Sequence, residues 1–252
     1  MQKERMRIDQ LLVVRGIAPT RERAQALLGA GEVYVQGKRV EKAGLRVPVN
    51  ALIEVRHDPN PYVSRGGLKL EGAIRALGID PKGWICADFG ASTGGFTDCL
   101  LQHGAARVYA IDVGRGLLHP KLRQDPRVVV CDRTNARHLT ASSLPEPMDL
   151  VTIDASFIGL AKLLPAARAV LRPPHSLQKG GKLLALIKPQ FEVDPSALRK
   201  GIVKNDEARK QAIEKVVRAS QEIGFEVHAV IDSVLRGADG NLEAFLWATL
   251  VA

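Results

Sequence analysis

Residues 87–98 read Ala-Asp-Phe-Gly-Ala-Ser-Thr-Gly-Gly-Phe-Thr-Asp, and this stretch decides the fold. The apolar run Trp84-Ile85-Cys86 precedes it and predicts the end of a buried strand. The run that follows has apolar residues at helical spacing and stops at Gly104. A strand, a glycine-rich turn and a helix in this order are typical of nucleotide-binding α/β domains. A tight turn without a ligand is the alternative that these residues leave open.

The glycine spacing argues against a dinucleotide. Gly90, Gly94 and Gly95 do not follow the G-x-G-x-x-G pattern, which brings the backbone close to a pyrophosphate. Asp88 stands two places before the first glycine, where its carboxylate would repel a phosphate and suit a cationic or hydroxyl-rich ligand. The pattern Asp-x-Gly-x-x-x-Gly-Gly resembles the first motif of methyltransferases that use S-adenosylmethionine. It disfavours a nicotinamide-dependent dehydrogenase.

The composition is that of an ordinary globular protein, but the charge is not. The 252 residues are 46% hydrophobic and 25% charged, and the formal net charge is +9. This charge favours a polyanionic partner, either nucleic acid or a membrane surface. The sequence contains neither a signal-peptide core nor an apolar run long enough to span a bilayer, so we expect a cytoplasmic protein. Cys86, Cys99 and Cys131 lack C-x-x-C spacing and predict core thiols, with no metal site.

Residues 1–58 predict a small basic α+β domain. Apolar residues at helical spacing indicate two helices, the second capped by Thr20, and a hairpin that turns at Gly37 follows. The segment holds eleven Lys and Arg against seven Asp and Glu, a net charge of 11 − 7 = +4. Six of these cations lie around the second helix and the hairpin: Arg7, Arg15, Arg21, Arg23, Lys38 and Arg39.

That cluster is the electrostatic footprint of a nucleic-acid binder, although a merely solvated basic face is the alternative. Tyr34 is the one aromatic residue of the segment, so recognition of phosphates or of shape is favoured over base stacking. The run Arg7-Ile8-Asp9-x-Leu11-Leu12, with its continuation to Gly37, resembles the S4 RNA-binding domain, which is named after a small-subunit ribosomal protein. This resemblance implies that the six cations bind RNA.

Residues 59–64 are expected to form a stiff linker, because two prolines lie among polar residues. Residues 65–252 then alternate between strand-like and helical runs, as an α/β domain does. Five strand-like runs end in charged residues: Asp88, Asp112, Asp132, Asp154 and Lys188. Carboxyl ends of parallel strands meet at one edge, so these side chains should gather there. The last two runs, 225–231 and 243–250, are joined by a short loop and predict an antiparallel pair at the sheet edge.

The aspartates at the strand ends predict how an adenosine ligand is held. Asp112 follows Gly90 by 112 − 90 = 22 positions, near the distance at which an acidic residue meets a ribose hydroxyl. Asp132 is expected to accept a hydrogen bond from the adenine amino group, and helix capping is the alternative for both. The predicted cofactor-binding residues are Asp88, Gly90, Ser92, Thr93, Gly94, Gly95, Phe96, Asp112 and Asp132.

A second polar group comes from four separate segments: Lys69, Asp154, Lys188 and Glu243. It resembles the Lys-Asp-Lys-Glu tetrad of RNA 2′-O-methyltransferases of the FtsJ/RrmJ type. Five motifs also look like the TlyA family, whose members join an S4 domain to this methyltransferase domain. They are Ser64-Arg65-Gly66-Gly67-x-Lys69-Leu70, the stretch 88–98, Asp154-Ala155-Ser156-Phe157, Lys188-Pro189-Gln190-Phe191-Glu192 and Gly240-Asn241-x-Glu243.

The resemblance implies a Rossmann-like class I methyltransferase domain, with a seven-stranded, mostly parallel sheet and an antiparallel edge strand, after a small α+β RNA-binding domain. It also implies S-adenosylmethionine as cofactor, ribosomal RNA or a ribosomal subunit as partner without stable membrane insertion, and 2′-O-methylation of ribose. Such catalysis needs positioning and removal of the hydroxyl proton, and no metal. Lys188 is expected nearest the hydroxyl, Asp154 would hold the lysines, and Glu243 would orient Lys69 or the substrate.

Two other functions remain open at this stage. TlyA-like proteins are also called haemolysins, and a basic protein could bind an anionic membrane. A non-catalytic RNA binder of the ribosome is the second, although the tetrad argues against it. The basic stretch 194–210 either closes over RNA or is a solvated connector into a helix predicted at 206–223.

Overall fold

The computed structural model describes residues 4–29, 31–56, 60–175, 179–237 and 239–251. The chain divides into two compact units, residues 1–61 and 62–252. The predicted linker, 59–64, spans this division. Residues 57–59, at the expected end of the first domain and start of the linker, lie outside the described part, and the linker boundaries stay a prediction.

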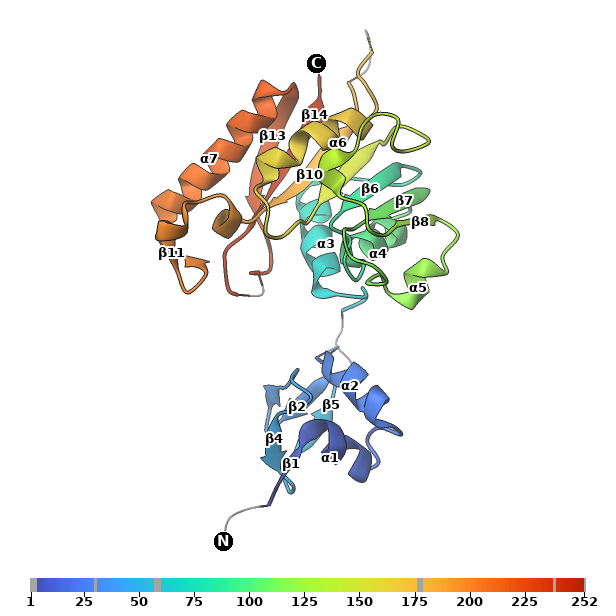
Figure 1. The fold of residues 1–252 in the computed structure, drawn as a ribbon, viewed down its shortest axis with the longest axis vertical. Coiled ribbons are helices and arrows are strands. Elements are labelled where there is room, and N and C mark those ends of the chain that lie inside the picture. Colours follow the sequence, from blue (N-terminus) through green and yellow to red (C-terminus); the bar gives the residue numbers. More distant parts are fainter. Residues whose placement is uncertain (1–3, 30, 57–59, 176–178, 238, 252) are drawn as a thin grey trace. The chain divides into compact units, whose positions relative to one another are not determined.

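The N-terminal unit combines two helices with short strands (Figure 1). Its elements are β1 (Arg5–Arg7), α1 (Ile8–Val14), α2 (Arg21–Gly29), β2 (Val33–Val35), β3 (Lys38–Arg39), β4 (Arg46–Pro48) and β5 (Ile53–Val55). Strands β3, β2 and β5 form one antiparallel sheet, and β1 pairs with β4 in another. The hydroxyl of Thr20 accepts a hydrogen bond from the Arg23 amide at 3.2 Å, which caps α2 as predicted. Ile8, Leu12 and Leu28 are fully buried. They lie in a hydrophobic core that is formed by residues of this unit.

The larger unit is built on a seven-stranded sheet in the order β13-β14-β10-β9-β6-β7-β8. In chain order its strands are β6 (Ile85–Phe89), β7 (Arg107–Ile111), β8 (Val128–Cys131), β9 (Leu150–Ile153), β10 (Lys182–Ile187), β13 (Phe225–Asp232) and β14 (Ala244–Leu250). Neighbours from β10 to β8 are parallel, whereas β14 runs antiparallel to both β10 and β13. The predicted fold class is confirmed: the sheet is mostly parallel, with an antiparallel pair at one edge.

Helices cover both faces of this sheet (Figure 1). They are α3 (Arg65–Leu77), α4 (Gly95–Gln102), α5 (Pro120–Arg123), α6 (Leu164–Val170) and α7 (Asp206–Glu222). Leu70 of α3 packs in one core with Cys86 of β6, and Val216 of α7 packs in another with Ala87. Successive strand residues point to opposite faces, so α3 and α7 lie on opposite sides of the sheet. Helix α4 joins the first core and α6 the second.

Short elements connect the last strands and helices. They are the 3₁₀ turns η1 (Ala136–His138), η2 (Leu160–Lys162), η3 (Pro189–Phe191) and η4 (Pro195–Ala197), and the strands β11 (Leu198–Arg199) and β12 (Ile202–Val203). The helix predicted at 206–223 is α7, and Asn205 caps it by accepting hydrogen bonds from two amides of its first turn. The basic stretch before it is therefore folded into η4 and a two-stranded hairpin, β11–β12.

The glycine turn brings the ends of β6 and β9 together. Gly90 has a φ of 84°, and a Cβ there would lie 2.7 Å from the carbonyl oxygen of Asp154. Gly94 has a φ of 97°, and a Cβ there would lie 2.2 Å from the side chain of Leu122. Both backbone angles favour glycine, and at Gly90 the approach of a backbone oxygen also excludes a side chain.

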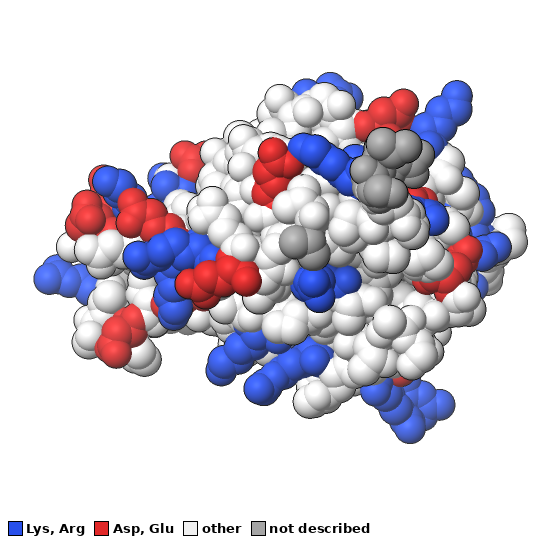
Figure 2. Space-filling view, turned by 90° about the horizontal axis from the view of Figure 1, so that it is seen from above, with Lys and Arg blue, Asp and Glu red and all other residues white. Residues whose placement is uncertain are grey.

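Positive and negative side chains are mixed on the face of the molecule that is at the top in Figure 1. Figure 2 shows that Lys and Arg side chains lie between Asp and Glu side chains over most of this face. The C-terminal end of β14 points to this side, so it is opposite to the carboxyl ends of the parallel strands. In the part of the chain that the structure describes, no helix is both long enough and apolar enough to cross a membrane.

Candidate active site

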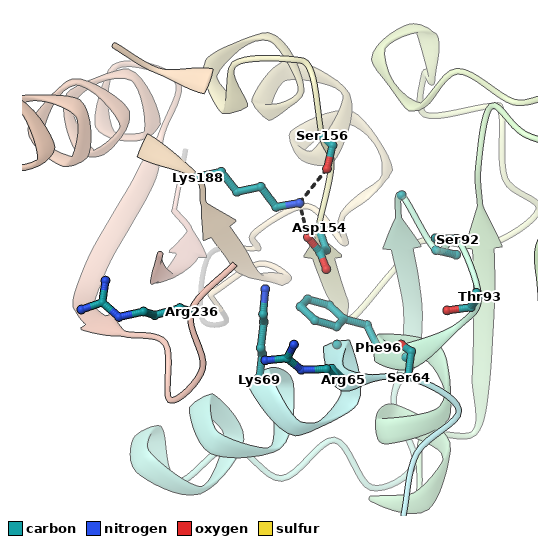
Figure 3. Close-up of a pocket in the computed structure, with 14 residues that line it drawn as sticks. Ser64, Arg65, Lys69, Ser92, Thr93, Phe96, Asp154, Ser156, Lys188 and Arg236 are labelled. Atoms are coloured by element: carbon teal, nitrogen blue, oxygen red, sulfur yellow. Dashed lines mark hydrogen bonds and ion pairs between the residues drawn. The ribbon is translucent and has the colours of Figure 1, made fainter. Parts of the chain in front are cut away.

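The four residues of the predicted tetrad come together as two ion pairs. Lys69 on α3 donates to Glu243, which directly precedes β14, with Nζ 2.5 Å from Oε2. Lys188, directly after β10, has its Nζ 2.7 Å from Oδ1 of Asp154, which follows β9, and 2.9 Å from the hydroxyl of Ser156. Figure 3 shows that Lys69, Asp154 and Lys188 point into the same cavity. Three strand ends and a helix thus place the tetrad at one edge of the sheet.

Both ion pairs are largely shielded from solvent. Exposed fractions are 12% for the Lys69 side chain, 2% for Glu243, 11% for Lys188 and 23% for Asp154. Charges this deep are stable only when they are paired, and loss of one partner of a buried pair costs about 3–5 kcal/mol. The ammonium groups of the two lysines are therefore held in fixed positions.

A cavity of about 270 Å³ joins the tetrad to the glycine turn (Figure 3). Lys69, Asp154 and Lys188 line one side of it. The other residues around it belong to the glycine turn, the start of α3 and the loops nearby: Ser64, Arg65, Gly66, Gly90, Ala91, Ser92, Thr93, Gly95, Phe96, Ser156 and Arg236. The first predicted motif and the tetrad therefore share one cavity.

A second pocket, of about 410 Å³, adjoins the glycine turn on the side of β7. Asp112 lines it, and its carboxylate accepts hydrogen bonds from the amides of Ser92 at 2.8 Å and Gly114 at 2.7 Å. Three large apolar side chains that also line it are unusually exposed: Val113 at 68%, Leu117 at 48% and Phe157 at 91%. A pocket with a fixed carboxylate and uncovered apolar walls suits a ligand that has both hydroxyl groups and a flat ring.

A third pocket, of about 480 Å³, lies on the other side of the tetrad. All four tetrad residues line it, together with Gln190, the aromatic rings of Phe157 and Phe191, and residues of the β11–β12 hairpin. The centres of these two rings are 5.4 Å apart. The side-chain oxygen of Gln190 is buried and has no hydrogen-bond partner among the described residues. We call this space the outer pocket.

Asp88 lies away from all three cavities. It is fully buried, and it accepts hydrogen bonds from the amide and hydroxyl of Thr97 at 2.9 and 2.7 Å and from the hydroxyl of Thr152 at 3.2 Å. Burial raises the pKa of Asp88 to about 7, although the bonds from Thr97 oppose this shift. These contacts tie the end of β6 to the first turn of α4, so Asp88 shapes the glycine turn from behind.

Asp132 also makes its contacts within the protein. It forms an ion pair with Arg123 at 2.8 Å and accepts a hydrogen bond from the amide of Gly116 at 3.0 Å. The hydrogen bond from Arg123 lowers the pKa of Asp132. Asp132 lines none of the three cavities. It instead fixes the loop 113–117, which carries two of the exposed apolar walls of the second pocket.

The cations of the N-terminal unit divide into two groups. Arg7 and Arg21 both reach the buried carboxylate of Asp9, at 3.0 and 2.9 Å, and the bond from Arg7 lowers the pKa of Asp9. Arg15 donates to the carbonyl oxygens of residues 49 and 51, and Arg39 pairs with an acidic neighbour at 3.0 Å.

The other two cations, Arg23 and Lys38, are exposed. Their side chains have no hydrogen bond or ion pair to another described residue. They are therefore available to a partner without breaking an existing contact.

Several residues that line the cavities were not predicted. Ser64, Arg65, Ser156 and Phe157 lie inside the recognised motifs, but nothing local marks them as cavity residues. Val113, Leu117, Asn135 and Arg236 lie outside the motifs. Their signal is exposure of an apolar side chain or position on a loop, which only the folded chain reveals.

Two family models match the chain. One is described as FtsJ-like methyltransferase and matches residues 62–250, and the other is described as S4 domain and matches residues 6–53. The two matches lie in the larger unit and in the N-terminal unit, respectively.

Three known proteins resemble it along most of their length. The 16S/23S rRNA (cytidine-2′-O)-methyltransferase TlyA of Mycobacterium tuberculosis is 43% identical over 245 residues, or 96% of this chain and 89% of the relative. Hemolysin A of Brachyspira hyodysenteriae is 38% identical over 241 residues, or 94% of this chain and 97% of the relative. The solved structure of a candidate hemolysin from Streptococcus thermophilus has a TM-score of 0.76 and 35% identity, and covers 99% of this chain and 90% of that one.

Proposed function

The chain belongs to the TlyA family of FtsJ-like methyltransferases, and from this premise we propose that it methylates ribose 2′-hydroxyl groups of ribosomal RNA with S-adenosylmethionine. The observation that carries the proposal is the tetrad, which lies between the cavity at the glycine turn and the outer pocket. A methyl donor on one side and a ribose on the other would meet at these four side chains. The relative from Mycobacterium tuberculosis has this activity in its name.

The residues around the glycine turn fit the cofactor. Gly90 lines both the cavity and the second pocket, and its lack of a side chain lets the backbone of Asp154 approach it closely. Each oxygen of Asp112 accepts one amide bond and keeps a lone pair for a ribose hydroxyl. Val113, Leu117 and Phe157 supply apolar surface for a purine ring. When bound, S-adenosylmethionine supplies an electrophilic methyl group on a positively charged sulfur.

The tetrad handles the acceptor. A ribose hydroxyl is a weak acid and a weak nucleophile, so the protein must orient it and remove its proton. We assign this proton to Nζ of Lys188 in its neutral amine form, after the ammonium has released its own proton to solvent; this nitrogen faces both the cavity and the outer pocket and is directed by Asp154 and Ser156. Lys69 places a positive charge beside the developing negative charge on the oxygen, and buried Glu243 holds it there.

The N-terminal unit would bind the RNA. Its S4 match and its unpaired cations, Arg23 and Lys38, support a contact with phosphates. Ribosomal RNA as a substrate would place the protein in the cytoplasm. We do not propose membrane lysis or non-catalytic binding, because neither would give the tetrad and its cavities a role.

Substitution of Lys188 tests the proposal. Lys188→Ala should abolish methyl transfer, whereas S-adenosylmethionine should still bind, because Asp112 and the apolar walls of its pocket are intact. Lys188→Arg should not restore transfer, since arginine keeps the charge but does not accept a proton. The assay measures tritium transferred from labelled cofactor to ribosomal subunits from cells that lack the gene, and calorimetry measures cofactor binding. Turnover by Lys188→Ala at the rate of the unmodified protein would contradict the assignment.

A further inference from the structure

The β11–β12 hairpin forms a wall of the outer pocket. Leu198 and Gly201 of the hairpin line this pocket together with the tetrad. Its two turn residues, Lys200 and Gly201, have φ angles of 52° and 78°. Positive φ at both positions is what a two-residue type I′ turn requires, and such a turn matches the twist of the strands it joins. The hairpin is therefore a defined element at the rim of the pocket.

Three cations of this hairpin segment are unpaired. Arg199, Lys200 and Lys204 are exposed, and within the described ranges none of their side chains has a hydrogen bond or an ion pair. Lys200 occupies a turn position that Asn or Gly fills at lower cost, because a positive φ brings Cβ close to the backbone carbonyl oxygen. The hairpin therefore presents positive charge that makes no ion pair with the described part of the chain.

The side chain of Asn241 forms hydrogen bonds with the backbone of the hairpin, close in the chain to the tetrad residue Glu243. Its side chain is 1% exposed, and its oxygen accepts a hydrogen bond from the amide of Val203 at 2.9 Å. Its side-chain nitrogen donates to the carbonyl oxygen of Gly201, also at 2.9 Å. Asn241 lies two positions before Glu243, so one short segment carries both the acid that holds Lys69 and the amide that holds the hairpin.

We propose that the β11–β12 hairpin binds the phosphates beside the acceptor ribose, and that Asn241 is the positioning residue that fixes the hairpin against the tetrad. The inference rests on the proposed function, because it takes the outer pocket as the place of the acceptor nucleotide. A strand whose ribose reaches Lys188 must carry its neighbouring phosphates past the rim of this pocket. The hairpin that forms a wall of this pocket carries three exposed cations, and inside the pocket the Gln190 oxygen has no hydrogen-bond donor among the described residues.

A triple variant tests the hairpin. Arg199→Ala, Lys200→Ala and Lys204→Ala together should raise the KM for ribosomal subunits and leave kcat unchanged. Each lost contact to a single strand reduces the slope of log KM against log salt by about 0.7, so three contacts predict a slope shallower by about 2. The control is Lys82→Ala, Lys210→Ala and Arg218→Ala, which removes the same charge from exposed positions outside the outer pocket.

Asn241→Ala tests the positioning role. This substitution alone should raise the KM for subunits and make the slope of log KM against log salt shallower. The binding of S-adenosylmethionine should not change. Added to the hairpin triple variant it should change KM no further, because its effect passes through cations that are already absent. An effect of Asn241→Ala that is as large in the triple variant as in the unmodified protein would overturn the positioning role.

The experiments distinguish a failure of the hairpin inference from a failure of the proposed function. If the unmodified protein transfers methyl groups to subunits but the hairpin and control variants have the same KM and salt slope, the hairpin inference is wrong and the function stands. If the unmodified protein transfers none, the proposed function itself is wrong. Should Asn241→Ala unfold, which loss of cofactor binding would reveal, the triple variant still decides whether the hairpin binds phosphates.

Discussion

Asp88 illustrates how a residue can belong to a predicted binding motif without lining any of the three cavities around it. From the sequence its carboxylate was expected at the methionine end of the cofactor. In the structure it is fully buried and bonded to Thr97 and Thr152. An acidic side chain is useful there because its two oxygens accept several bonds at once, one of them from an amide of the first turn of α4. Any effect of Asp88 on the proposed cofactor would therefore pass through the shape of the turn.

The buried carboxyl of Asp88 predicts how stability depends on pH. Burial raises its folded-state pKa to about 7, from an unfolded value of 3.8, so the folded state binds more protons between these values. The free energy of unfolding should therefore fall as pH rises from 5 to 8, and Asp88→Asn should flatten this dependence. Urea titrations that follow tryptophan fluorescence report the larger unit, because Trp84 and Trp247 both lie in it. Equal pH dependence in both proteins would contradict the prediction.

At the scale of elements, the loop 113–117 separates the roles of two aspartates. Asp112 lines the second pocket directly, whereas Asp132 holds the loop through Arg123 and Gly116. Asp112→Ala should weaken cofactor binding roughly 10- to 150-fold, since charged hydrogen bonds contribute about 1.5–3 kcal/mol. Asp132→Ala removes a partly exposed ion pair that solvent screens, so it should weaken binding much less than Asp112→Ala does. A larger loss for Asp132→Ala in calorimetry would favour direct contact with the adenine.

The seven strands of the large sheet and helices α4 and α7 could be predicted from the sequence, because each had a clear local signal. Apolar runs that end in charged residues and glycines at fixed spacing led to the correct order of these elements along the chain. Strands β1 and β4 were not predicted, since a strand of three residues is too short for an alternating pattern to be recognised. The exposed walls Val113 and Leu117 could not be predicted either, because exposure is a property of the folded chain.

At the scale of the whole molecule, two separate cationic surfaces are proposed to bind one RNA. One includes Arg23 and Lys38 of the N-terminal unit, and the other is the β11–β12 hairpin. If both contact the same RNA at once, their losses should add in log KM and in the salt slope. A variant that combines Arg23→Ala and Lys38→Ala with the hairpin triple variant measures this sum. A combined variant no weaker than the hairpin triple variant alone would show that the two surfaces do not act together.

The central claim is that the methyl group goes to a ribose oxygen. The most direct measurement incubates the purified protein with labelled S-adenosylmethionine and ribosomal subunits from cells that lack the gene, and then digests the RNA in alkali. A methylated 2′-oxygen cannot attack the neighbouring phosphate, so the account predicts label in alkali-resistant dinucleotides and in a 2′-O-methylnucleoside identified by mass spectrometry. Label released in mononucleotides that carry a methylated base would contradict it.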